Sequence, residues 1–109
     1  MDALTETAAK DFISRISKKY DLLGVILFGS RARNDFRPDS DADIAVLLRR
    51  NPQHFVTTKL AMDDDAYDVL LNTGVRIQPL PIWENEWLHP DAYANPALLH
   101  NIELEGVRL

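Results

Sequence analysis

The sequence contains no cysteine, few histidines and no long apolar run. Without cysteine the chain has no disulfide framework, no zinc-thiolate site and no thiol nucleophile, and a reducing cytoplasm is its natural setting. No apolar stretch approaches the roughly 20 residues of a transmembrane helix, and the N-terminus lacks the basic start and apolar run of a signal peptide. We therefore expect a cytoplasmic protein with no membrane partner and no redox chemistry.

A surplus of positive charge is also missing. The chain has 17 Asp and Glu against 12 Lys and Arg, which gives a formal net charge of -5. Polynucleotides are held largely through their phosphates, and that mode of binding favours a basic surface. Nucleic acid is therefore not expected as the main partner, although one local basic cluster can still hold a single nucleotide.

The length of 109 residues predicts a single domain, residues 1–109, which can bury a core without a metal or a disulfide. Apolar residues at three- and four-residue steps predict an amphipathic N-terminal helix of about four turns. The apolar residues of this helix are Leu4, Ala8, Phe12, Ile13, Ile16 and Tyr20.

Three apolar runs predict strands. Residues 22–28 and 41–48 are so uniformly apolar beyond their first positions that each is expected to be buried on both faces. Residues 75–82 predict a third strand, in which Pro79 and Pro81 remove backbone donors. This loss confines that strand to an edge of the sheet or to a bulge.

Two further helices complete the expected α/β fold, a small mixed sheet flanked by helices. One runs from about Thr57 to Thr73, with Gly74 as its stop. Its apolar residues are expected to face the core, and they are Leu60, Ala61, Tyr67, Leu70 and Leu71. The other lies between Asn95 and Gly106, and residues 107–109 can add a short edge strand.

The segment between the first two strands, residues 29–43, concentrates the chemistry. Asp41 and Asp43 are two apart on a strand, so their carboxylates point to one face with Cα atoms about 6.5 to 7 Å apart. Two such charges repel each other unless a cation lies between them. Oxygen ligands of this kind suit Mg²⁺, which takes its remaining ligands from water and substrate phosphates.

The turn before these aspartates suits phosphate. Gly29 lets an anion approach the backbone, and the amides that follow Ser30 begin one helical turn, which attracts negative charge. Basic side chains in the same loop can add charge-assisted contacts to a triphosphate, namely those of Arg31, Arg33 and Arg37. The segment thus combines a phosphate cradle with a metal anchor.

Other interpretations of the segment are weaker. A Gly-Ser turn alone, or an acidic loop alone, is usually structural. The alternating acids from Asp39 onward imitate a calcium loop, but Ile44 and Arg50 stand where that loop requires glycine and glutamate. The turn is not a P-loop either, because no Gly-Lys-Ser/Thr follows it. The joint pattern therefore favours a nucleotide and metal site.

This joint pattern, Gly29-Ser30, ten intervening residues and then Asp41-Ala42-Asp43, resembles the signature of the polymerase-beta-like nucleotidyltransferase superfamily. The GSRAR and RPDSDAD segments and the ending NIELEGVRL are similar to those of its minimal nucleotidyltransferases. The resemblance implies that Asp41 and Asp43 are catalytic and bind Mg²⁺. It also implies nucleotide binding by Gly29, Ser30, Arg31 and Arg33.

Members of this family often act as antitoxins of a HEPN-domain toxin, a ribonuclease that they neutralise by adenylylating a tyrosine. The resemblance therefore implies transfer of AMP from ATP to a protein hydroxyl, with Mg²⁺ as cofactor and a HEPN-type toxin as partner. Whether the chain forms a homo- or hetero-oligomer stays open. Transfer to a small molecule is less expected, because so short a chain has no second substrate domain.

One departure from the family pattern concerns catalysis. Many members place a third carboxylate on the strand after the next helix, where this chain has Gln78, and an amide cannot accept a proton at neutral pH. Acids from neighbouring segments could approach instead, and the candidates are Asp65, Asp68, Glu84 and Glu86. We expect absence of the third acid rather than its displacement. The alternative function is therefore a catalytically degenerate domain that neutralises or regulates a partner by binding.

Overall fold

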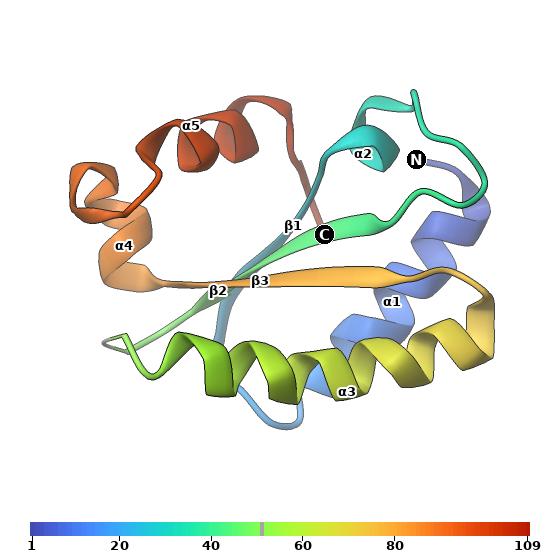
Figure 1. Cartoon of the computed structure of the whole chain (residues 1–109), viewed down its shortest axis with the longest axis horizontal. Coiled ribbons are helices and arrows are strands. Elements are labelled where there is room, and N and C mark those ends of the chain that lie inside the picture. The colour runs from blue at the N-terminus through green and yellow to red at the C-terminus, as the bar shows by residue number, and fades with distance from the viewer. Residues whose placement is uncertain (51) are drawn as a thin grey trace.

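The computed structural model describes residues 1–50 and 52–109, which form a mixed four-stranded sheet between two layers of helices (Figure 1). The strand order is β3-β2-β1-β4, with β2 parallel to β3 and β1 antiparallel to both β2 and β4. The bounds are β1 (Leu22–Phe28), β2 (Ala42–Leu48), β3 (Ile77–Trp83) and β4 (Val107–Arg108). The predicted α/β fold class is confirmed.

The helices divide between the two faces of the sheet (Figure 1). One face is covered by α1 (Ala3–Ile16) and α3 (Phe55–Thr73). The other carries α2 (Ser30–Arg33), α4 (Glu84–Leu88), a 3-10 turn (Pro90–Ala92) and α5 (Pro96–Glu105). No helix among the described residues is both long and apolar enough to cross a membrane.

The central strand β2 is buried on both faces, as its sequence predicts. Ile44 and Val46 belong to the core that α1 and α3 cover, whereas Ala45 and Leu47 belong to the core under α5. Side chains alternate along a strand, so the same alternation points Asp43 toward the α5 face at the point where β2 begins. The core packing of β2 therefore determines the direction of that carboxylate.

The N-terminal helix has about four turns, as predicted, but its apolar ends differ from the prediction. Leu4 is exposed and Tyr20 lies beyond the end of α1. Thr5 takes the buried position in the first turn, because its hydroxyl accepts a hydrogen bond from the buried guanidinium of Arg31 at 2.8 Å. The buried contact at this end of the helix is therefore made by the polar Thr5 and not by the apolar Leu4.

The predicted inward face of α3 is wrong. Leu60, Ala61, Tyr67 and Leu71 are exposed, and Leu70 is half-buried. The side chains that α3 buries are those of Met62, Asp65, Ala66 and Val69, which lie on the opposite side of the helix. Asp65 can be buried because both of its carboxylate oxygens accept hydrogen bonds from Lys19 Nζ, at 2.9 and 3.1 Å. The predicted stop at Gly74 is confirmed by its left-handed conformation, with φ 79°.

The third strand lies at the edge of the sheet, as its prolines predict. In β3, Pro79 and Pro81 are still paired in register with β2, on one side only. Proline offers no backbone N–H, so this edge is a poor template for a strand from another chain.

Two alanine substitutions on α3 test which of its faces is in the core. Met62 is fully buried, so Met62→Ala should lower the free energy of unfolding by about 2 to 4 kcal/mol, because it opens a cavity. Leu60→Ala, on the exposed face, should change it by less than about 0.5 kcal/mol. Urea unfolding followed by circular dichroism measures both values. A larger decrease in the free energy of unfolding for Leu60→Ala than for Met62→Ala would support the buried helix face that was predicted from the sequence.

Candidate active site

The candidate site forms where β1 ends and β2 begins. Phe28 pairs with Asp43 across the antiparallel strands, so Gly29, the next residue, reaches the Asp43 side chain. Gly29 has φ 76°, and a Cβ atom placed on it would lie 2.3 Å from Asp43 Oδ2. Both the backbone conformation and the close approach therefore require glycine at this position. The predicted phosphate turn and the predicted metal ligand are in direct contact.

The helical turn α2 follows Gly29 at once. It begins at Ser30, and Asn34 ends it in the left-handed conformation with φ 62°. Ala32 N and Arg33 N both donate to Gly29 O at 3.1 Å, whereas the first two amides of α2, those of Ser30 and Arg31, have no acceptor within the helix and are available to an anion. The half-buried hydroxyl of Ser30 makes no hydrogen bond to any residue that the structure describes.

Neither aspartate has a cation closer than 3.8 Å among the described residues. Asp43 makes no hydrogen bond or ion pair within the described part of the chain, and Asp41 Oδ1 lies 3.8 Å from Arg76 Nε. Burial raises the pKa of Asp43, the negative charge of Asp41 raises it further, and the positive charge of Arg33 opposes both effects. A half-buried carboxylate beside a second one is stabilised by a divalent cation. The donor set therefore fits Mg²⁺ held by Asp41 and Asp43.

Arg33 lies at the end of α2, close enough for its charge to act on Asp43. Its side chain is exposed, with Nε 3.2 Å from an Asp35 oxygen and Nη1 3.4 Å from a Glu105 oxygen. Exposed ion pairs of this kind contribute little to stability. A phosphate could therefore replace them as the partner of Arg33 at small cost.

Arg31 points away from this site into the protein, and it is 2% exposed. Its guanidinium donates hydrogen bonds to the backbone oxygens of Ser40 and Pro38, at 2.9 and 3.2 Å, as well as to Thr5. It also stacks over the Phe36 ring, 4.5 Å from the centroid. This position does not support the predicted direct contact between Arg31 and a nucleotide. The residue instead ties the loop before Asp41 to α1.

Gln78 lies beside Asp43 in the parallel register of β2 and β3. The resemblance to the family leads us to expect a third acid at this position. The alternative acids lie elsewhere. Asp65 binds Lys19 under the opposite face of the sheet, and Asp68 lies 3.6 Å from Arg15. Glu84 and Glu86 follow the far end of β3. Among the described residues no group of three His, Cys, Asp or Glu is placed to bind a metal.

Arg76, which stands just before β3, is a neighbour of the site that no sequence motif indicates. Ala42 pairs with Ile77, and Ala42 N donates to Arg76 O at 2.8 Å, so Arg76 neighbours Asp41. Only the strand pairing reveals this proximity. Arg76 is the exposed cation nearest to Asp41 among the ion pairs of the described chain, and it adds positive charge at the edge of the site.

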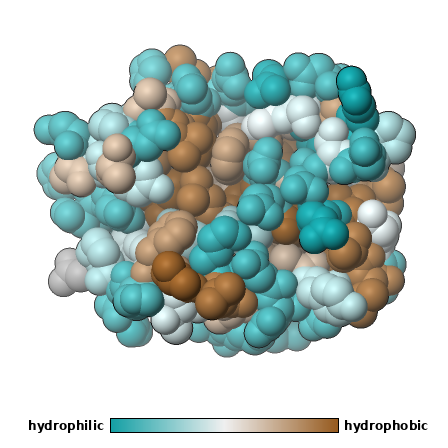
Figure 2. Space-filling model, viewed as in Figure 1, coloured by the Kyte–Doolittle hydropathy of each residue, from teal (hydrophilic) through white to brown (hydrophobic). Residues whose placement is uncertain are grey.

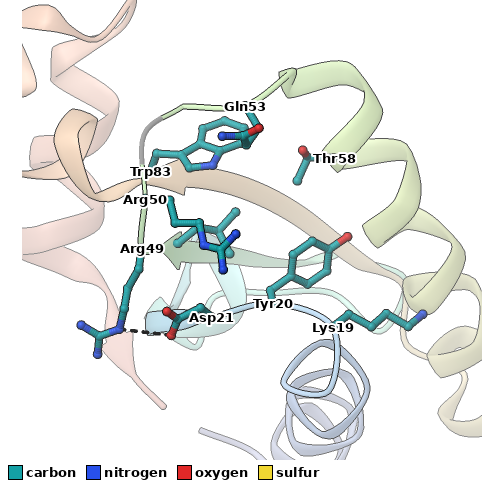
Figure 3. A pocket seen from close by; sticks show the side chains of 9 residues that line it. Lys19, Tyr20, Asp21, Arg49, Arg50, Gln53, Thr58 and Trp83 are labelled. Carbon is teal, nitrogen blue, oxygen red and sulfur yellow. Dashed lines mark ion pairs between the residues drawn. The ribbon is translucent and has the colours of Figure 1, made fainter.

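A pocket of about 260 Å³ lies at the opposite end of the sheet (Figure 3). Arg50, Tyr20 and Trp83 gather around it, whereas Arg49 turns to Asp21, with Nε 3.2 Å from a carboxylate oxygen. This pocket begins where β2 ends, at Leu48, about 17 Å along the strand from Asp43. It is therefore separate from the site at Gly29 and Asp43.

The family model for polymerase beta nucleotidyltransferases matches residues 10–108. The chain belongs to this family. A Methanocaldococcus jannaschii protein named "Putative protein adenylyltransferase MJ1305" is 28% identical over 72 residues, which are 64% of this chain and 49% of that protein. The chain thus spans about half the length of that relative.

A solved structure supports the fold of this nucleotidyltransferase-family chain. It is described as "a putative nucleotidyltransferase from Sulfolobus solfataricus". The match has a TM-score of 0.57 at 19% identity and covers 99% of this chain and 87% of that one. The sheet and helices described above are therefore an arrangement that a crystal structure also contains.

Substitution of Arg31 tests its structural role. Arg31→Met should lower the free energy of unfolding by about 3 kcal/mol, because two backbone oxygens and the Thr5 hydroxyl lose their buried donor. Arg37→Met is the matched control in the same loop: it is exposed, and we expect a change below about 0.5 kcal/mol. Urea unfolding measures both. Equal effects would mean that the buried hydrogen bonds contribute nothing.

Substitution of Asp43 tests the cost of its charge. The folded-state pKa is raised, so the charged carboxylate destabilises the folded state at neutral pH and this penalty fades as the pH falls through that pKa. In metal-free buffer at pH 7, Asp43→Asn should therefore raise the melting temperature by a few degrees.

The advantage of Asp43→Asn should disappear below pH 3.8, the ordinary pKa of aspartate, where the wild-type side chain is neutral in both states. Asp39→Asn is the control, since Asp39 is an exposed acid of the same loop. Differential scanning calorimetry across the pH range gives the difference directly. A melting temperature lower than that of the wild type at pH 7 would contradict a destabilising charge.

Proposed function

We propose that this domain is a Mg²⁺-dependent nucleotidyltransferase that moves AMP from ATP to a hydroxyl group on a partner protein. The contact between Gly29 and Asp43 is the observation that supports it most, because it joins a turn open to phosphate with a carboxylate suited to a cation. The name of the Methanocaldococcus jannaschii relative favours AMP as the transferred group and protein as the acceptor.

In this proposal each side chain at the site has one role. The turn at Gly29 and Ser30 binds the β- and γ-phosphates of ATP through backbone amides and the Ser30 hydroxyl. Asp41 and Asp43 hold the Mg²⁺, and Arg33 adds positive charge toward the phosphates. When bound, the metal offsets the negative charge that develops on the phosphate oxygens during transfer.

The transfer itself is an in-line displacement at the α-phosphorus. The acceptor hydroxyl oxygen forms a bond to that phosphorus, the bond to the oxygen bridging the α- and β-phosphates breaks, and pyrophosphate leaves with the electron pair. The hydroxyl proton must also leave, and the amide of Gln78 cannot accept it. In this proposal the proton passes to water, to a substrate phosphate or to the partner, and we expect slow turnover.

We further propose that the partner is a HEPN-type toxin and that the domain acts as its antitoxin in the cytoplasm. This step depends on the resemblance of the GSRAR and RPDSDAD segments to those of minimal nucleotidyltransferases. The net charge of -5 adds support, since it disfavours a polynucleotide as the main partner.

A second candidate function is inhibition by contact without catalysis. The specific observation in its favour is the presence of Gln78, and not an acid, beside Asp43. In that case the site could still bind nucleotide, while neutralisation of the partner would depend only on the interface.

Intact-mass measurement after incubation with Mg-ATP and the product of the adjacent gene tests the proposed function. The partner should gain the mass of one or more AMP units. Asp41→Asn and Asp43→Asn should each slow this gain about a hundredfold or more, because a metal contributes several kcal/mol to stabilisation of the transition state. Asp39→Asn, in the same loop, should retain the wild-type rate.

Three results would change the conclusion. A partner that is silenced with no gain in mass, by the wild type and by both variants, would support inhibition by contact. A gain that persists in Asp41→Asn and Asp43→Asn would remove these residues from the mechanism. Labelling of the partner by other nucleoside triphosphates in preference to ATP would correct the transferred group.

A further inference from the structure

The outer face of α3 carries an apolar stripe that the fold leaves uncovered. Its members are Val56, Leu60, Tyr67 and Leu71, which are 56%, 59%, 59% and 69% exposed. Spacings of four, seven and four residues place them within about 60° of one another around the helix. The stripe lies opposite Met62 and Ala66, which pack into the core. Single exposed apolar residues are ordinary, but an aligned set marks an interaction surface.

The middle of the stripe is acidic. Asp63 and Asp64 stand between Leu60 and Tyr67, and Asp63 Oδ1 lies 3.0 Å from Lys59 Nζ. Asp64 is exposed and forms no ion pair with any residue in the described ranges. Figure 2 shows apolar surface at both ends of the lower front, over α3, with hydrophilic surface between them. The pattern is therefore apolar, acidic, apolar along one helix face.

A second copy of this chain is a poor occupant of the stripe. Two copies of α3 can pair antiparallel about the midpoint between Asp63 and Asp64, which sets Val56 against Leu71 and Leu60 against Tyr67. The same symmetry brings the two acids of each copy together at the centre of the interface. Like charges in that position are strongly unfavourable. The shape of the stripe permits self-pairing, but its charge opposes it.

The same geometry defines a better occupant. We propose that the outer face of α3 docks an amphipathic helix of a different protein, with apolar residues at matching spacing and Lys or Arg at its centre. The apolar residues of that helix would cover the stripe, and its cations would lie opposite Asp63 and Asp64. This inference goes beyond the proposed function, because it requires neither nucleotide binding nor transfer.

A pocket of about 400 Å³ joins this face to the edge of the sheet. Lys59, Asp63 and Tyr67 line it from α3, Gln78 lines it from β3, and Arg76 lines it from just before that strand. Arg76 in turn lies 3.8 Å from Asp41. A helix docked on α3 would therefore cover one side of this pocket and bring the partner close to the candidate active site.

Two separate helical peptides, each stapled internally so that it stays helical, provide the probes. Both carry apolar residues at the spacing of the stripe, one with two lysines at its centre and the other with two glutamates. Fluorescence anisotropy should show that the lysine peptide binds the full chain at least about tenfold more tightly. The difference should shrink at high salt, which screens exposed charges. A glutamate-peptide affinity equal to that of the lysine peptide would overturn the charge argument.

Matched variants locate the binding site. Leu71→Ser should weaken binding of the lysine peptide about tenfold, whereas Leu104→Ser, at an equally exposed leucine on α5, should leave it unchanged. Circular dichroism checks that both variants fold. Asp43→Asn should retain peptide binding, which separates this inference from the proposed transfer reaction.

Two further outcomes would overturn the inference. One is failure of the lysine peptide to bind the folded wild type. The other is a wild-type dimer in sedimentation equilibrium that Leu71→Ser abolishes and Leu104→Ser does not, which would show that a second copy covers the stripe.

Discussion

The candidate site depends on the antiparallel pairing of Phe28 with Asp43. This one register places Gly29 against the Asp43 carboxylate and directs that carboxylate to the α5 face of the sheet. A slip of one residue would turn Asp43 toward the core under α1 and α3, and would expose Ile44 in its place. The apolar packing of β2 therefore holds the site in register, so stability and site geometry share a single constraint.

Arg31 extends this constraint to the loop before β2. Its guanidinium satisfies the backbone oxygens of Pro38 and Ser40 and is itself buried, so the segment that leads into Asp41 is fixed to α1 through Thr5. A buried cation with a hydrogen bond from each of its three guanidinium nitrogens supplies rigidity, whereas the exposed Arg33 can exchange its partners. Two arginines two residues apart therefore have opposite environments, one buried and structural and the other exposed. Asp43 differs from both arginines, since its carboxylate forms no ion pair with the described residues and its burial raises its pKa, so its charge costs stability in the folded state.

The sequence was sufficient for features that local chemistry determines. The strands, the helix stop at Gly74 and the edge position imposed by Pro79 and Pro81 all follow from residues within a few positions of one another. It was insufficient where distant packing decides. Periodicity identifies apolar stripes on α3 but does not say which one faces the core, and a cluster of arginines does not say which one is buried. The proximity of Arg76 to Asp41 becomes visible only in the pairing of Ala42 with Ile77.

Two features of this domain would each be completed by a partner protein. Next to Asp43 the chain presents Gln78, which cannot take the proton of an acceptor hydroxyl, and on α3 it presents an apolar stripe that nothing in the described chain covers. The pocket between Tyr67 and Gln78 connects the two. A protein docked on α3 would cover the stripe and stand beside the residues that lack a base. Under the proposed function, the acceptor protein would therefore form part of the working site, because it would supply both the contact surface and the environment in which its own hydroxyl reacts.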